Sequence, residues 1–224
     1  PRLVLAYVSV GEAEDYRYYW DGPARRGAAA FLDRPNPQWP GNFAVRFWDP
    51  GWRAILFGRP GAWIDRIVQA GFDGVYLDTV DAAESWVDRG RTDAPERMAD
   101  LVRDLASHAR RQDPAFLVVA SNPFPLLGLP GVAAALSGIV AEDHVMRGEA
   151  PARPKALKGV LAPLRESARS GIPVMLIDYP RTLAGRERYA SLCASEGFLC
   201  YAGVRALDRP GTLLPRGERK EVRP

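Results

Sequence analysis

Short apolar runs alternate with amphipathic segments along almost the whole chain, and this alternation constrains the fold more than any other feature of the sequence. The runs are nearly continuous in apolar character, which is typical of strands covered on both faces of a sheet. Seven such candidate strands are readable: residues 3–10, 43–47, 73–77, 115–120, 137–141, 173–177 and 197–202.

Helical periodicity fills most of the intervals between these runs. Residues 94–112 give the clearest pattern, because Pro95 suits a first helical turn and the apolar residues recur on one face. Further helices are predicted over 62–70, 155–170 and 184–195, and Gly71 and Gly171 are stop signals for the first two.

Regular β-α alternation predicts a parallel sheet with right-handed crossovers. The expected fold class is α/β, a TIM (β/α)8-type barrel with seven strands readable in this chain and the first β/α unit missing. A doubly wound open sheet is the competing architecture. We expect the barrel to occupy residues 1–209 and a basic C-terminal tail to occupy residues 210–224.

Composition excludes several classes of protein. The longest apolar runs are shorter than the 18 residues that a membrane span needs, so no span is expected. The net charge is only +3, and the one dense basic run lies at the C-terminus, so nucleic acid is not an expected partner. The two histidines are too few for a His-based metal site. No metal or other cofactor is expected.

The two cysteines, Cys193 and Cys200, exclude a disulfide-rich scaffold. A single bridge and two buried thiols are both compatible with their spacing, and we expect thiols.

Polar residues follow the predicted strands where each strand ends. In a parallel barrel the carboxyl ends of the strands surround the active site, so these side chains are candidates for catalysis or substrate binding. The residues at or just after the predicted strand ends are Glu12, Asp49, Asp78, Asn122, Glu142, Asp178 and Tyr179.

Three carboxylates spaced three residues apart, Asp78, Asp81 and Glu84, stand at the end of the strand predicted over 73–77. Asp78 is expected to point into the mouth of the barrel, and Asp81 to lie beside it. The alternative is that Asp78 merely caps a following helical turn, since Asp is a favoured N-cap.

Cleaving a glycosidic bond requires at least two carboxyl groups on facing strands, one that attacks or activates water and one that donates a proton. Glu142 directly follows an apolar strand two strands beyond Asp78, so the two are predicted to form a catalytic pair. The alternative for Glu142 is an ion pair with a nearby arginine.

Aromatic residues are concentrated in the N-terminal part of the chain: 16 of the 22 lie in residues 1–86, including all six tryptophans. Aromatic rings stack on the apolar faces of sugars, so Tyr16, Trp20 and Trp48 are candidate substrate contacts. The alternative is that several of these rings fill the core.

Three segments, YVSVGEAEDYRYYW (7–20), AGFDGVYLDTVDAAESW (70–86) and VAEDHV (140–145), resemble glycoside hydrolase family 114, the endo-α-1,4-polygalactosaminidase-like TIM barrels. The resemblance runs over almost the whole chain. It implies Asp78 and Glu142 as the catalytic pair, with Glu12 and Glu14 as substrate contacts. Analogous barrels with an Asp at this position lead us to expect a retaining mechanism.

The resemblance also implies the substrate and the location. The expected substrate is an α-1,4-linked, galactosamine-containing polysaccharide of the galactosaminogalactan type, and the expected location is secreted or in the cell envelope. We expect the protein to act as a monomer. A carbohydrate-binding barrel without turnover is the main alternative, and a barrel enzyme that binds phosphate through Arg181 and Arg205 is a third.

Overall fold

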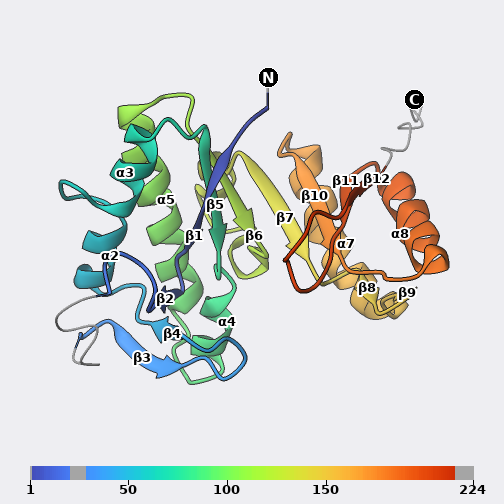
Figure 1. Cartoon of the computed structure of the whole chain (residues 1–224), viewed down its shortest axis with the longest axis horizontal. Coiled ribbons are helices and arrows are strands. Elements are labelled where there is room, and N and C mark those ends of the chain that lie inside the picture. Colours follow the sequence, from blue (N-terminus) through green and yellow to red (C-terminus); the bar gives the residue numbers. More distant parts are fainter. Residues whose placement is uncertain (1, 21–28, 215–224) are drawn as a thin grey trace. The chain divides into compact units, whose positions relative to one another are not determined.

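The computed structural model describes residues 2–20 and 29–214. The chain divides into two compact units, which we call the N-terminal unit (residues 1–137) and the C-terminal unit (residues 138–224). Each unit contains three parallel strands with helices packed on them (Figure 1).

The parallel sheet of the N-terminal unit has β5 (Gly74–Asp78) at its centre, between β1 (Leu5–Ser9) and β6 (Leu117–Ser121). Gly74 allows the close approach of β6, because a Cβ at this position would lie 2.2 Å from the Leu117 carbonyl oxygen. The register pairs Ser9 with Asp78, so both lie at the carboxyl end of the sheet.

The helices of this unit confirm the predicted amphipathic pattern. α5 (Ala94–Gln112) buries the predicted apolar face, which consists of Met98, Leu101, Val102, Leu105 and Ala109. It packs against α3 (Trp63–Gln69), which is followed by Gly71 at a φ of +77° (Figure 1). The shorter helices are α2 (Pro50–Leu56), α4 (Ala82–Val87), η1 (Phe124–Leu126) and α6 (Val132–Ala135).

The run at 43–47 is not a strand of the parallel sheet, and that prediction is wrong. It forms β4 (Asn42–Val45), which pairs antiparallel with β2 (Glu12–Glu14) and β3 (Leu32–Pro35) in a separate three-stranded sheet. The apolar pattern identifies a strand but not its partner, which depends on how residues 12–14 turn back after β1.

The C-terminal unit has a parallel sheet in the order β7 (Gly138–Glu142), β10 (Val174–Asp178), β11 (Leu199–Ala202). α7 (Pro154–Arg169) packs on β10 and α8 (Leu183–Glu196) packs on β11 (Figure 1). A hairpin of β8 (Met146–Arg147) and β9 (Ala150–Pro151) follows β7. Among the described residues, six of the seven predicted runs are thus parallel strands, three in each unit, and the run at 43–47 is the exception.

The predicted tail begins too early. β12 (Thr212–Leu214) pairs antiparallel with β11 and therefore belongs to the sheet. Residues 215–224 of the predicted tail lie outside the described residues.

Cys193 and Cys200 form a disulfide, which corrects the expectation of free thiols. Cys193 lies near the end of α8 and Cys200 in β11, and both are buried. The bridge ties α8 to the strand that follows it. The sequence could not decide this, because the pairing depends on a turn at Gly197 that brings helix and strand together.

We expect the double replacement Cys193→Ala/Cys200→Ala to lower the free energy of unfolding by about 2–3 kcal/mol, because the bridge restricts the unfolded chain over a short loop. Thermal unfolding with and without reductant measures this effect. Reductant should lower the unfolding midpoint of the parent protein and leave that of the variant unchanged. A parent protein that is insensitive to reductant under conditions shown to open the bridge would contradict a stabilising role.

Candidate active site

The predicted carboxylates lie at strand ends, as expected for a parallel α/β fold. Asp78 is the last residue of β5 in the N-terminal unit. Glu142 and Asp178 are the last residues of β7 and β10 in the C-terminal unit. The pairing of Asp78 with Glu142 stays a prediction.

Tyr7 contacts Asp78, and the sequence did not single it out. Its hydroxyl donates a hydrogen bond to Asp78 Oδ2 over 2.7 Å. Burial, followed by the charge of Asp78, raises the pKa of Tyr7, so the hydroxyl stays protonated and acts as a donor. In the sequence, Tyr7 could have been noticed because it places a polar hydroxyl within the apolar run at 3–10.

Asp78 does not cap the following helix. The N-cap of α4 is Asp81, whose side chain makes no capping hydrogen bond. Burial, together with the charges of Asp78, Glu84 and Glu12, raises the pKa of Asp81 to about 6. The carboxylates at this strand end therefore form a negatively charged cluster, which explains their spacing better than capping does.

Glu12 is held in place by two neutral side chains. Asn36 Nδ2 and Asn42 Nδ2 donate to its two carboxylate oxygens over 2.7 and 3.0 Å. Amide donors orient a carboxylate without neutralising its charge. Glu12 thus adds an oriented negative charge to the surroundings of Asp81, and its role as a substrate contact stays a prediction.

Glu14 is different from Glu12, because it is buried and ion-paired. Arg17 Nε donates to Glu14 Oε2 over 2.7 Å, and the Tyr16 hydroxyl donates to Oε1. The Arg17 guanidinium also lies over the ring of Trp63. These contacts favour a structural role for Glu14, whereas Tyr16 itself is 66% exposed and stays a candidate contact.

The aromatic residues divide into core and partly exposed groups. Tyr19, Trp52 and Trp63 are buried, and the Tyr19 ring contacts both tryptophans, so the core-filling alternative holds for them. Trp20 is only partly buried and stacks on Phe43, with ring centroids 4.8 Å apart.

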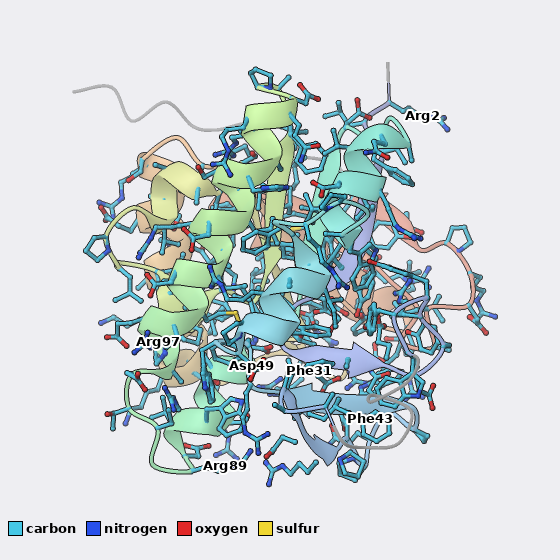
Figure 2. The ribbon with its side chains drawn as sticks, turned by 90° about the vertical axis from the view of Figure 1, so that its left-hand side faces the viewer. Arg2, Phe31, Phe43, Asp49, Arg89 and Arg97 are labelled. Atoms are coloured by element: carbon cyan, nitrogen blue, oxygen red, sulfur yellow. A yellow bond between two sulfur atoms is a disulfide. The ribbon has the colours of Figure 1, made fainter. Side chains whose placement is uncertain are left out.

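Trp48 and Asp49 stand between β4 and α2. Trp48 packs edge-on against Trp86, and the Arg91 guanidinium covers its ring at 3.9 Å. Asp49 caps α2 by accepting a hydrogen bond from the Gly51 amide over 2.7 Å, and it is labelled beside Phe31 in Figure 2. Both residues therefore have structural contacts in addition to the predicted substrate role.

In the C-terminal unit, the Tyr179 hydroxyl donates a hydrogen bond to Glu142 Oε1. The next residue, Asp143, forms an ion pair with Arg205 over 2.6 Å. Each candidate catalytic carboxylate thus has a tyrosine hydroxyl as a hydrogen-bond donor. Asp178, predicted as a substrate contact, is instead buried, and its carboxylate accepts hydrogen bonds from backbone amides.

A pocket of about 520 Å³ lies beside Tyr179 in this unit, which is within the usual range for small-ligand sites. Arg181 and Arg205, the candidates for binding phosphate, both line it. Arg205 pairs with Asp143, and Arg181 lies 3.8 Å from the carboxylate of Glu149. These carboxylates partly neutralise the two arginines, which weakens the phosphate alternative.

Three non-glycine residues adopt a left-handed backbone conformation directly after a strand end. Thr79 follows β5, Asn122 follows β6 and Asp143 follows β7, with φ values of 58°, 49° and 60°. Such residues cost energy and cluster at functional sites. This feature marks the same strand ends as the carboxylates do, and only the backbone geometry reveals it.

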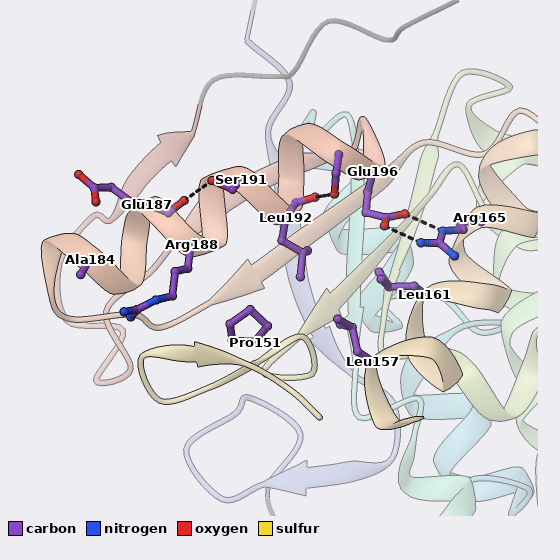
Figure 3. A pocket seen from close by; sticks show the side chains of 11 residues that line it. Pro151, Leu157, Leu161, Arg165, Ala184, Glu187, Arg188, Ser191, Leu192 and Glu196 are labelled. Atoms are coloured by element: carbon purple, nitrogen blue, oxygen red, sulfur yellow. Dashed lines mark hydrogen bonds and ion pairs between the residues drawn. The ribbon is translucent and has the colours of Figure 1, made fainter. Parts of the chain in front are cut away.

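A second hollow of about 640 Å³ lies between α7 and α8 (Figure 3). Leucine side chains of both helices line it, and Arg165 and Glu196 form an ion pair across one end. It contains no candidate catalytic residue. None of the described helices is long and apolar enough to span a membrane.

Known proteins resemble this chain in both sequence and structure. The sequence profile of glycoside-hydrolase family GH114 matches residues 2–211. An uncharacterized protein of Deinococcus radiodurans is 36% identical over 209 residues, which is 93% of this chain and 66% of the relative. Protein MJ1477 of Methanocaldococcus jannaschii is 32% identical over 184 residues, 80% of this chain and 52% of the relative. The chain therefore spans between half and two thirds of the length of these relatives.

Two solved structures show the fold. The glycoside hydrolase domain of PelA from Pseudomonas aeruginosa superposes with a TM-score of 0.69 at 23% identity, covering 93% of this chain and 80% of that domain. Aspergillus fumigatus Ega3, solved in complex with galactosamine, gives a TM-score of 0.68 at 19% identity, covering 95% and 78%. The fold is thus α/β and TIM-barrel-like, as predicted, and with the profile match over residues 2–211 the chain belongs to glycoside hydrolase family GH114.

Proposed function

We propose that this protein is a glycosidase that cleaves α-1,4-linked, galactosamine-containing polysaccharide, with Asp78 and Glu142 as its catalytic carboxylates. The observation that carries the proposal is the equivalent local setting of each residue within its own unit. Each ends a parallel strand, and each accepts a hydrogen bond from a tyrosine hydroxyl, Tyr7 for Asp78 and Tyr179 for Glu142.

In the proposed retaining mechanism, Asp78 attacks the anomeric carbon while Glu142 donates a proton to the departing glycosidic oxygen. The product of this step is a glycosyl ester on Asp78. Glu142 then removes a proton from water, which attacks the anomeric carbon and releases Asp78 as a carboxylate. This mechanism requires carboxyl groups about 5–5.5 Å apart, whereas inversion through a single water requires about 6.5–9.5 Å.

The acidic cluster supports a cationic substrate. The charges of Asp78, Glu84 and Glu12 all act on Asp81 at one strand end. A protonated galactosamine residue carries an ammonium group, which such a cluster attracts despite the small net positive charge of the chain. The complex of the related fold in Ega3 with galactosamine supports the same class of substrate.

The proposal is tested by incubating the protein with galactosaminogalactan and measuring the masses of the products by mass spectrometry. Hydrolysis should release oligosaccharides, each with the mass of a whole number of sugar residues plus one water. Binding without release of fragments would instead favour the carbohydrate-binding alternative, in which the barrel has lost turnover.

Replacing Asp81 with asparagine should weaken substrate binding and stabilise the fold at neutral pH. The pKa of Asp81 is raised from 3.8 to about 6 in the folded protein. Its charge therefore opposes folding above pH 6, and this cost vanishes below about pH 4, where the residue is protonated in both states. The expected gain in the free energy of unfolding at pH 7 is about 1–3 kcal/mol.

Two measurements check this prediction. Denaturant unfolding of Asp81→Asn and the parent protein should differ at pH 7 and agree at pH 4. Binding of galactosamine oligomers to the parent protein should strengthen as the pH rises through 6, and the variant should lack this step. Equal stability at pH 7 would contradict the placement of Asp81 in the acidic cluster.

We also propose an extracytoplasmic location. The disulfide between Cys193 and Cys200 supports it, because disulfides persist mainly in oxidising compartments.

A further inference from the structure

Asp178 has an unusual place for a charged side chain. It ends β10 and is only 1% exposed. Its Oδ2 atom accepts hydrogen bonds from two successive backbone amides, those of Val145 at 3.1 Å and Met146 at 3.2 Å. Burying a carboxylate costs free energy unless hydrogen-bond donors satisfy it, and the two amides supply such donors to Asp178.

The amides that Asp178 holds belong to the segment directly after Glu142. This segment leaves β7 through Asp143, whose left-handed backbone (φ 60°) turns the chain toward β10. The Asp143 amide donates to the Ile177 carbonyl oxygen over 2.9 Å. Glu142 is thus fixed on one side by the β7–β10 ladder and on the other by the amides that Asp178 binds three and four residues later.

The residue after Asp178 contacts Glu142 itself, because the Tyr179 hydroxyl donates to its carboxylate. The carboxyl end of β10 therefore contributes both a donor to the Glu142 side chain and an anchor for the backbone behind it. Burial raises the pKa of Asp178, the two amides and Arg147 lower it, and the charge of Asp143 raises it, so that the pKa is about 6. The Tyr189 hydroxyl of α8 also lies near this carboxylate.

We propose that Asp178 is a positioning residue that fixes the Glu142 carboxyl group by holding the backbone of residues 145 and 146. The inference rests on the proposed catalytic role of Glu142. It differs from the substrate contact predicted from the sequence, because here Asp178 acts through the backbone amides whose hydrogen bonds its Oδ2 atom accepts.

Three variants test the proposal. Asp178→Ala removes both hydrogen bonds and should lower kcat for galactosaminogalactan about 10–100-fold while KM changes less than about twofold, since a small displacement of a catalytic group is enough for such a loss. Asp178→Asn keeps an oxygen that can accept both amides and should recover most of kcat. The matched control is Glu149→Gln, because Glu149 anchors the same loop at a different point, the Thr182 amide and hydroxyl. It should keep kcat within about threefold.

Amide hydrogen exchange supplies a readout that does not depend on activity. The Val145 and Met146 amides should lose protection in Asp178→Ala and keep it in Asp178→Asn. Unchanged protection in the alanine variant would overturn the anchoring.

The outcomes separate this inference from the proposed function. If the parent hydrolyses the polymer and Asp178→Ala does so equally well, or if Glu149→Gln loses as much kcat as Asp178→Ala, positioning is overturned while the glycosidase proposal stands. If the parent fails to hydrolyse the polymer, the proposed function fails. Positioning is then decided by the NMR signals of the Glu142 side chain at one fixed pH, which should shift in the alanine variant and stay close to those of the parent in the asparagine variant.

Discussion

Replacing Asp78 with asparagine is expected to abolish hydrolysis of galactosaminogalactan while leaving binding of the polymer largely intact. An amide cannot attack the anomeric carbon, so kcat should fall by about a thousandfold or more. The fold at the site should persist, because the Tyr7 hydroxyl can donate to the amide oxygen as it does to Asp78 Oδ2. Steady-state kinetics and calorimetric binding of the oligosaccharide measure the two effects.

Asp73→Asn is the matched control for this prediction. Asp73 directly precedes β5, at the opposite end of the strand from Asp78, and its Oδ2 accepts a hydrogen bond from the Val4 amide over 2.7 Å. This variant should keep kcat within about threefold, because surface changes away from the site have small effects. Substantial turnover by Asp78→Asn would remove Asp78 from the chemistry, and the carbohydrate-binding alternative would gain if the parent protein also failed to turn over.

Glu142→Gln is expected to slow cleavage of the polymer by about 10²–10⁴-fold, because a glutamine cannot protonate the departing oxygen. The loss should be much smaller for an aryl glycoside whose leaving group departs without a proton. Comparing kcat/KM for the two substrates measures this difference.

The control for Glu142→Gln is Glu149→Gln. Glu149 lies in the segment that follows Glu142, and its carboxylate accepts a hydrogen bond from the Thr182 amide at the start of α8. It should leave both substrates nearly unaffected. A Glu142→Gln variant that slows the aryl glycoside as strongly as the polymer would contradict the assignment of Glu142 as the acid. In that outcome the residue would act on binding or folding instead.

Local patterns in the sequence were sufficient for most of the elements. The amphipathic stripe of α5 and the apolar runs of β1, β5, β7 and β10 depend on neighbours along the chain, so periodicity identifies them. The same patterns place Asp78 and Glu142 at strand ends. They could not assign β4 to its antiparallel sheet, because a short apolar run has the same pattern in a parallel and in an antiparallel strand.

Where a side chain could have several partners, tertiary contacts decided which one it has. Glu12 and Glu14 lie two residues apart in one strand, yet one faces two asparagines and the other is buried against Arg17. Their different surroundings come from residues 36 and 42 in one case and from the turn at 16–17 in the other. Sequence spacing treats the two carboxylates alike because it contains no information about these neighbours.

The order of β/α elements, the family resemblance and the identity of the candidate carboxylates were determined by the sequence alone, because each depends on residue type and spacing. The tertiary structure alone decided that Tyr7 donates to Asp78, that Asp178 holds backbone amides and that Cys193 bonds to Cys200. Each of these contacts joins residues on different elements. Its geometry exists only after the strands have taken their register and the helices have packed on them.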